Sequence, residues 1–242
     1  MKKFELTTDF ITFCGVKLFR IRALIEFDDV KAGDVGGYIE EEKNLSQLDD
    51  AWVYGNAKVY GNAEVYCDAK VFGNAEVYGN AKVYGNAWVY GNAKVYDDAW
   101  VYGNAKVYGN AEVYCDAKVF DDAWVYGNAK VCGDAWVYGN ALVFGNAWVY
   151  GNAWTYGDAW VCGDALVCDD ADYATIKGFG KICRTTTFFR EKDRIAVRCG
   201  CFYGGLDDFR EKVKETHKDS KMGKEYLMIA DLMEYHFKKE EE

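Results

Sequence analysis

The side chains best suited to covalent chemistry lie in the last quarter of the chain. Cys201 and His217 supply a thiol and an imidazole, the pair that a cysteine nucleophile and its general base require. They would form such a pair if a helix ending at His217 folds back over the strand that carries Cys201. The structural alternative is a buried cysteine and a histidine at a helix end. Arg184, Arg190 and Arg198 are candidates for an anion-binding pocket, or are solvated strand residues.

A zinc site is a second interpretation of this region. Cys183, Cys199, Cys201 and His217 have the right side chains, but Cys-x-Cys lacks the two-residue gap of common zinc sites. We therefore expect no metal site and no cofactor. The nine cysteines are odd in number and no signal peptide is evident, which favours reduced thiols in the cytoplasm. No apolar run has the length of a membrane helix.

A long repeat precedes these residues and organises the chain. Residues 49–174 are 21 consecutive hexads, most commonly Gly-Asn-Ala-x-Val-Tyr. The third position is Ala in all 21 hexads and the fifth is Val in 19, with Thr155 and Tyr173 as the exceptions. Residues two apart in a strand share a face, so Ala and Val point one way and x and Tyr the other.

The residue types decide which face is inside. Position x holds Lys, Glu, Trp, Leu or Asp, which cannot all be buried without partners, so we expect Ala and Val to face inward. The second position is Asn or Asp every time, and these residues tolerate left-handed backbone geometry best after glycine. Each hexad is therefore predicted to form one short strand and one corner.

This pattern resembles the left-handed parallel β-helix of hexapeptide-repeat proteins. The resemblance implies three hexads per coil, hence seven coils, and it alone supplies the hand. At about 4.8 Å per coil the rod would be roughly 34 Å long. Many hexapeptide-repeat proteins are acyltransferases with a histidine from the coil as general base. This chain has no histidine before His217, so the resemblance extends to the fold, and a degenerate acyltransferase is an alternative.

Steps of three hexads align the outward residues in columns. One x column alternates Trp with Lys and predicts a cation–π ladder, and a second alternates Lys with Glu and predicts an ion-pair ladder. Columns of Tyr, Phe or Cys run beside them. This aromatic surface predicts an interface with further copies or with a partner, although self-stacking that stiffens the rod also explains it. The interface candidates are Trp52, Trp88, Trp100, Trp124, Trp136, Trp148, Trp154 and Trp160.

Three segments follow from these patterns. Residues 1–48 are expected to form a β cap with a hairpin turn at Cys14-Gly15, and 49–174 the β-helix. Residues 175–242 are expected to form a small α+β module, with strands over 185–203 and helices over 206–217 and 224–237. Residues 31–40 resemble the start of bacterial and prophage hexapeptide-repeat proteins, and 200–209 resemble a module that follows repeats in phage proteins.

Charge and internal identity bear on function. Residues 49–174 carry 7 basic and 17 acidic residues, so nucleic-acid binding along the rod is not expected. Residues 49–72 and 97–120 are identical, yet eight hexads apart, which places the copies on different faces and favours length over a one-face site.

The sequence thus predicts an all-β solenoid that acts as a non-enzymatic, rigid scaffold of phage or prophage origin. It would form a homo-oligomer and bind a host protein or a small-molecule ligand, without contact to nucleic acid or membrane. One alternative is a phage anti-defence effector that sequesters a nucleotide signal or blocks a host protein. A second is a cysteine-dependent enzyme centred on Cys201.

Overall fold

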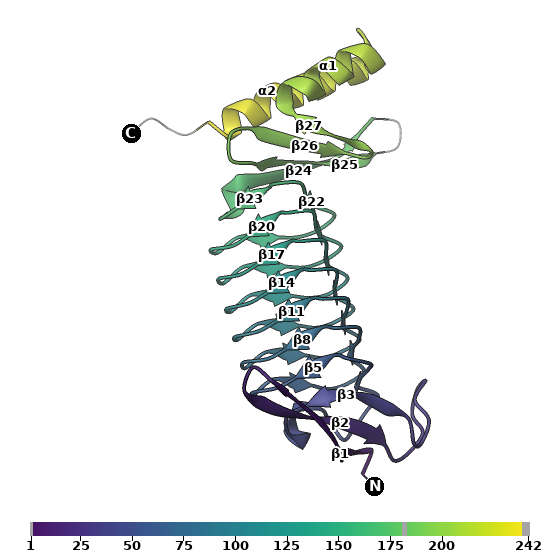
Figure 1. Ribbon diagram of the computed structural model, residues 1–242. Helices are drawn as coiled ribbons and strands as arrows, with labels where there is room; N and C mark the ends of the chain where they lie inside the picture. Colours follow the sequence, from purple (N-terminus) through teal and green to yellow (C-terminus); the bar gives the residue numbers. More distant parts are fainter. Residues whose placement is uncertain (1, 181–182, 239–242) are drawn as a thin grey trace.

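The computed structural model describes residues 2–180 and 183–238. A β-hairpin lies at one end of a tall parallel coil, and a small sheet with two helices lies at the other (Figure 1). The two ends of the chain therefore lie at opposite ends of the molecule (Figure 1). Within the described residues no helix combines the length and the apolar character needed to cross a membrane.

Residues 52–167 form 20 two-residue strands, one in each hexad. Away from the two ends of the coil, each strand pairs in parallel with the strands three hexads before and after it, as Val107 does with Val89 and Val125. This pairing confirms a three-sided parallel solenoid of about seven turns, because consecutive hexads fall on three different sheets.

The strands divide among the three sheets as follows. One sheet holds β4 (Trp52–Val53), β7 (Lys70–Val71), β10 (Trp88–Val89), β13 (Lys106–Val107), β16 (Trp124–Val125), β19 (Leu142–Val143) and β22 (Trp160–Val161). The second holds β6 (Glu64–Val65), β9 (Lys82–Val83), β12 (Trp100–Val101), β15 (Lys118–Val119), β18 (Trp136–Val137) and β21 (Trp154–Thr155). The third holds β5 (Lys58–Val59), β8 (Glu76–Val77), β11 (Lys94–Val95), β14 (Glu112–Val113), β17 (Lys130–Val131), β20 (Trp148–Val149) and β23 (Leu166–Val167).

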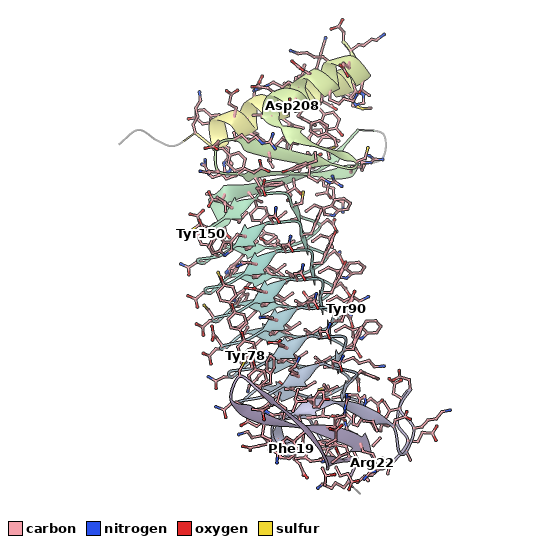
Figure 2. All side chains as sticks on the ribbon, viewed as in Figure 1. Phe19, Arg22, Tyr78, Tyr90, Tyr150 and Asp208 are labelled. Carbon is pink, nitrogen blue, oxygen red and sulfur yellow. The ribbon has the colours of Figure 1, made fainter. Side chains whose placement is uncertain are left out.

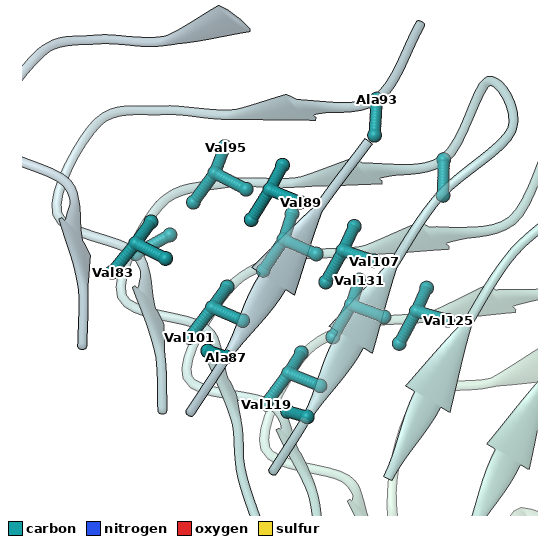
Figure 3. Close-up of a cluster of buried hydrophobic side chains, with 14 of the residues drawn as sticks. Val83, Ala87, Val89, Ala93, Val95, Val101, Val107, Val119, Val125 and Val131 are labelled. Atoms are coloured by element: carbon teal, nitrogen blue, oxygen red, sulfur yellow. The ribbon is translucent and has the colours of Figure 1, made fainter. Parts of the chain in front are cut away.

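The interior of the coil is built from the third and fifth positions, as predicted. Ala87 and Val89 are fully buried, and the same holds for the matching Ala and Val of every coil around them (Figure 3). The three walls converge on this core, so only small and medium side chains fit there. The core is therefore uniform along the rod.

The corner prediction was wrong in one respect. The left-handed residue of the hexad is the first, not the second: Gly91 has φ 73°, and Asp97 and Cys115 adopt 56° and 57°. A Cβ at Gly91 would lie 3.0 Å from the nitrogen of Gly109 in the next coil, so close stacking of corners also favours glycine there.

The second position serves a different purpose. Its asparagine side chains stack from coil to coil, and most of their amides donate to the side-chain oxygen at the same corner of the next coil. Asn92 Nδ2, for example, donates to Asn110 Oδ1 at 3.1 Å, and Asn110 donates to Asn128 at 3.0 Å. These ladders pair polar groups that would otherwise compete with the backbone at the corners.

The amino-terminal cap begins with a hairpin. Strands β1 (Phe4–Phe13) and β2 (Val16–Ala23) are antiparallel and turn at Cys14 and Gly15, which both have positive φ. Strand β3 (Val35–Ile39) then joins the coil in parallel with β5, and the short helix η1 (Glu42–Asn44) follows.

The coil starts before the hexads do. Ile39 pairs with Val59 and Leu45 with Val65, so two sides of an earlier turn are already formed by the cap. Both partners lie two positions further along the chain than a step of three hexads would place them. That phase change hides these two strands from a search for a strict period of six.

Buried polar groups close this end of the rod. The ammonium of Lys3 donates to the carbonyl oxygens of Leu48, Asp49 and Ala51 at 3.2, 3.1 and 2.8 Å. Desolvation lowers the pKa of Lys3 to about 8, against the opposing charges of nearby aspartates. Asn44 donates to the carbonyl of Ala63 at 2.9 Å. Carbonyls that have no preceding coil thereby receive donors.

The last hexad departs from the predicted strand. Residues Asp170–Asp172 form the short helix η2, and Tyr173 begins β24 (Tyr173–Phe179) of a separate antiparallel sheet. Tyr173 occupies the hexad position that holds an inward-facing Val elsewhere, and the narrow interior of the coil has too little space for its ring. Its hydroxyl instead donates to the carbonyl of Trp154 at 2.6 Å.

The carboxyl-terminal module closes the other end. Its sheet runs in the order β24, β25 (Arg184–Arg190), β26 (Ile195–Cys199) and β27 (Phe202–Gly205). Helices α1 (Leu206–His217) and α2 (Lys221–His236) cover the sheet face away from the coil (Figure 1).

Helix η2 and the module also pair free amide groups of the last coil. The backbone N–H of Trp154 donates to Asp170 at 2.8 Å and that of Trp160 to the hydroxyl of Thr187 at 3.0 Å. Phe189 and Ala196 continue the buried core of the coil into the module. One hydrophobic core therefore runs from Phe4 in the first strand to Ala196 in the carboxyl-terminal module.

Candidate functional site

Stacked rings cover all three walls of the coil. In the sixth-position column the rings of Tyr84 and Tyr102 lie 4.9 Å apart and 1° from parallel, and Tyr90 and Tyr108 lie 4.7 Å apart. Side chains such as Tyr78, Tyr90 and Tyr150 project outward from the ribbon (Figure 2). Each ring is partly covered by the rings above and below it, and burial raises the pKa of Tyr78 and Tyr108 to about 12.

Cation–π contacts join the x residues on two walls. Lys106 lies 5.1 Å from the ring of Trp88 and 4.8 Å from that of Trp124, as the alternating column predicts. Lys118 lies 5.2 Å from Trp100 and 4.7 Å from Trp136, so a second column forms the same contact.

The predicted ion-pair ladder does not form. Among the described residues of that column the single ion pair joins Lys130 to Glu112 at 3.6 Å. Glu112 also accepts from the hydroxyl of Tyr96 at 3.4 Å. Exposed pairs of this kind contribute little free energy, so nothing holds the other long side chains of the column together.

Trp52 is not part of an exposed wall. It is 1 % exposed, because Phe4 and Phe27 of the cap pack edge-on against its ring. The other seven interface candidates remain on the surface, and Trp154 and Trp148 are the most exposed of them at 43 % and 41 %.

One groove lies on this surface, on the wall of β12, β15, β18 and β21. Its apolar floor is Trp100, Trp136 and Trp154, and the last two rings stack at 5.0 Å. Carboxylates of Asp98, Asp116 and Asp134 line one edge, and the groove encloses about 660 Å³. It offers both aromatic and charged contacts to another surface.

A second cavity lies in the carboxyl-terminal module, between the sheet and the two helices. It has a volume of about 610 Å³, and Cys201, His217 and Arg184 all line it. The helix that ends at His217 thus returns this residue to the cavity that Cys201 lines. The helix residues Lys212 and Thr216 and the aromatic Tyr226 also line the cavity and were missed. The spacing of four between Lys212 and Thr216 on α1 is the signal that could have found them.

The cysteine and the histidine are not arranged as a catalytic pair. In the described part of the chain no hydrogen bond joins the Cys201 thiol to the His217 ring, which instead stacks on Tyr226 with centroids 5.8 Å apart. The zinc candidates are not gathered into a ligand set either: within residues 2–180 and 183–238, no group of three or more His, Cys, Asp or Glu side chains could hold a metal ion.

The three arginine candidates do not converge on one pocket. Arg190 forms an ion pair with Asp172 at 2.7 Å and lies over the ring of Phe237. Arg198 lies over the ring of Trp160 at 5.4 Å, on the side of the sheet that faces the coil. Arg184 alone of the three lines the cavity between the sheet and the helices.

Comparison with known proteins supports the fold. A family model described as the YdcK β-solenoid repeat matches residues 75–91 and 135–151. No curated protein matches the chain. Each matched stretch is nearly one coil long and lies within the repeat. The chain is therefore a repeat β-helix protein, a parallel β-solenoid whose coils are similar to YdcK solenoid repeats.

Proposed function

We propose that this protein is a non-enzymatic scaffold that holds two end modules at a fixed separation and presents its aromatic walls to partners. The observation that carries this proposal is the single core that runs unbroken from Phe4 to Ala196. A shared core couples the three segments, so the end modules cannot swing independently. Paired amides and carbonyls at both ends add to that coupling.

The first partner is another copy of the chain. Tryptophans such as Trp88, Trp124 and Trp148 are more than a third exposed and recur along the rod. Large regular apolar surfaces in water are usually covered, and closed symmetric assemblies are the common solution for identical chains. The resemblance to phage and prophage repeat proteins supports a phage or prophage origin of the chain. Its nine unpaired cysteines support a reducing compartment as the place where it works.

Two experiments test the proposal. Sedimentation velocity at micromolar concentration should show an assembly larger than the 27.4 kDa chain. Replacement of Trp88, Trp124 and Trp148 by Lys should dissociate it while the β-rich circular dichroism spectrum is kept. A monomeric parent protein would refute the association.

The scaffold itself is tested by removing one coil, residues 73–90. Because β7 then leads into β11 on the correct side, the shortened rod should still unfold cooperatively. Removal of one hexad, residues 73–78, is the matched comparison: identical hexads already occupy different faces, so this rod should fold as well, with its carboxyl-terminal module turned by about a third of a turn relative to the amino-terminal cap. Loss of cooperative unfolding when the whole coil is removed would contradict the three-sided register.

A further inference from the structure

The cavity in the carboxyl-terminal module has a lining of unusual charge. Among its described lining residues three are basic in type, Arg184, Lys212 and His217, and none is acidic. A cavity of this character attracts an anion.

The remaining lining is apolar. Phe179, Phe202, Val213 and Met222 form walls, and the pocket-facing ring of Phe209 is buried. A volume of about 610 Å³ falls in the range of small-molecule sites. Apolar walls of this extent suit a ligand whose body is apolar and leave few donors for a sugar or a base.

Arg184 is the principal cation of the lining, and its exposed side chain lies beside the backbone of Gly200. Its guanidinium lies against Gly200, where an added Cβ would come within 2.1 Å of Nη1. Gly200 has φ 60°, a left-handed conformation that glycine adopts without strain. In the described residues Arg184 makes no ion pair, whereas Lys212 shares its charge with Glu215 at 3.2 Å. Arg184 is thus available to a ligand.

We propose that this cavity binds a small molecule with an apolar body and a single anionic group, the anion held by Arg184 and Lys212 and the body lying between Phe202, Val213 and Met222. The site is independent of the scaffold role, because every residue in it belongs to the module and none to the coil.

The probe is 8-anilinonaphthalene-1-sulfonate, and the matched neutral probe is N-phenyl-1-naphthylamine, which has the same rings without the sulfonate. Titration calorimetry of the full chain should show one sulfonate site per chain. Arg184→Gln should weaken sulfonate binding by roughly five- to tenfold and Lys212→Gln by less, while the neutral probe is unaffected. Lys214→Gln, on the same helix but outside the cavity, is the matched control and should change neither affinity.

Two further variants separate this cavity from the aromatic walls. Thr216→Trp fills the exposed rim and should abolish the site for both probes, and Gly200→Ala should displace Arg184 and mimic its loss. Decanoate should displace the sulfonate probe, and adenosine monophosphate should not. The proposal is overturned if Arg184→Gln and Thr216→Trp bind the sulfonate as the parent does, or if the nucleotide displaces it and decanoate fails.

Discussion

Replacing the hydroxyl of Thr155 by a methyl group tests the description of the coil interior. Thr155 occupies the inward position that holds Val in its column, pairs with Val137, and is fully buried. Its hydroxyl oxygen makes no hydrogen bond within the described residues. A buried hydroxyl without a partner costs about 1–3 kcal/mol in proteins.

Thr155→Val replaces that hydroxyl by a methyl group of nearly the same volume. The change should raise the free energy of unfolding by about 1–2 kcal/mol, because the desolvation cost disappears and an apolar contact is gained. For a chain of this size that corresponds to a rise in Tm of roughly 2–8 °C. Urea denaturation followed by tryptophan fluorescence, with a parallel thermal scan, measures both.

Thr187→Val is the matched control. The Thr187 hydroxyl is also buried, but it accepts the N–H of Trp160 at 3.0 Å. The same chemical change should therefore lower stability by about 1–2 kcal/mol, since an amide loses its partner. If Thr155→Val is neutral or destabilising while Thr187→Val behaves as expected, the Thr155 hydroxyl is satisfied and the description of the coil interior is refuted.

Three further predictions follow from the core, the corners and the tyrosine columns. Val107→Asp should lower the free energy of unfolding by at least about 3 kcal/mol and unfold the rod, because it places an unpaired carboxyl between Val89 and Val125. A melting temperature indistinguishable from that of the parent would contradict the assignment of Val107 to the interior. Cys67→Gly should stabilise by about 0.5–1 kcal/mol, because φ 57° strains any residue with a Cβ, whereas Cys67→Ala keeps the Cβ and should give no gain in the same denaturation assay. Stability should fall at alkaline pH, because burial raises the pKa of Tyr78 and Tyr108 to about 12. The contribution of these neutral rings to stability is complete below the unfolded-state pKa near 10 and is lost as pH rises towards 12. Tyrosinate absorbance and circular dichroism recorded together should show coincident transitions.

Much of the coil could be predicted because its information is local and repeated. A period of six with Ala and Val at its third and fifth positions fixes which side chains face inward, and pairing every third hexad follows once three sides are assumed. The hand does not follow, since every third hexad pairs alike in either hand, and it was taken from the resemblance. Position one, rather than position two, adopts the left-handed conformation, and corners stack so closely there that a Cβ meets the next backbone, which favours glycine.

The ends of the rod were harder to predict because they depend on tertiary contacts. Ile39 and Leu45 form coil strands outside the hexad phase, and Lys3 reaches carbonyls that are distant along the chain. Trp52 has the same sequence context as exposed tryptophans and is buried only because the cap covers it. The cavity was found in part: Cys201, His217 and Arg184 share it, but the roles of Arg190 and Arg198 depend on which sheet face they occupy.

The central claim, that the coil is a rigid spacer, is tested most directly by a distance measurement. Spin labels would be placed at Leu48 and Met228, which are exposed near opposite ends, in a variant whose native cysteines are replaced. Pulsed electron–electron double resonance would compare the parent with rods that lack or duplicate residues 73–90. A mean distance that changes by up to about 4.8 Å per coil, with a narrow and constant width, is the predicted result. A distance independent of coil number, or a distribution that broadens as coils are added, would contradict it.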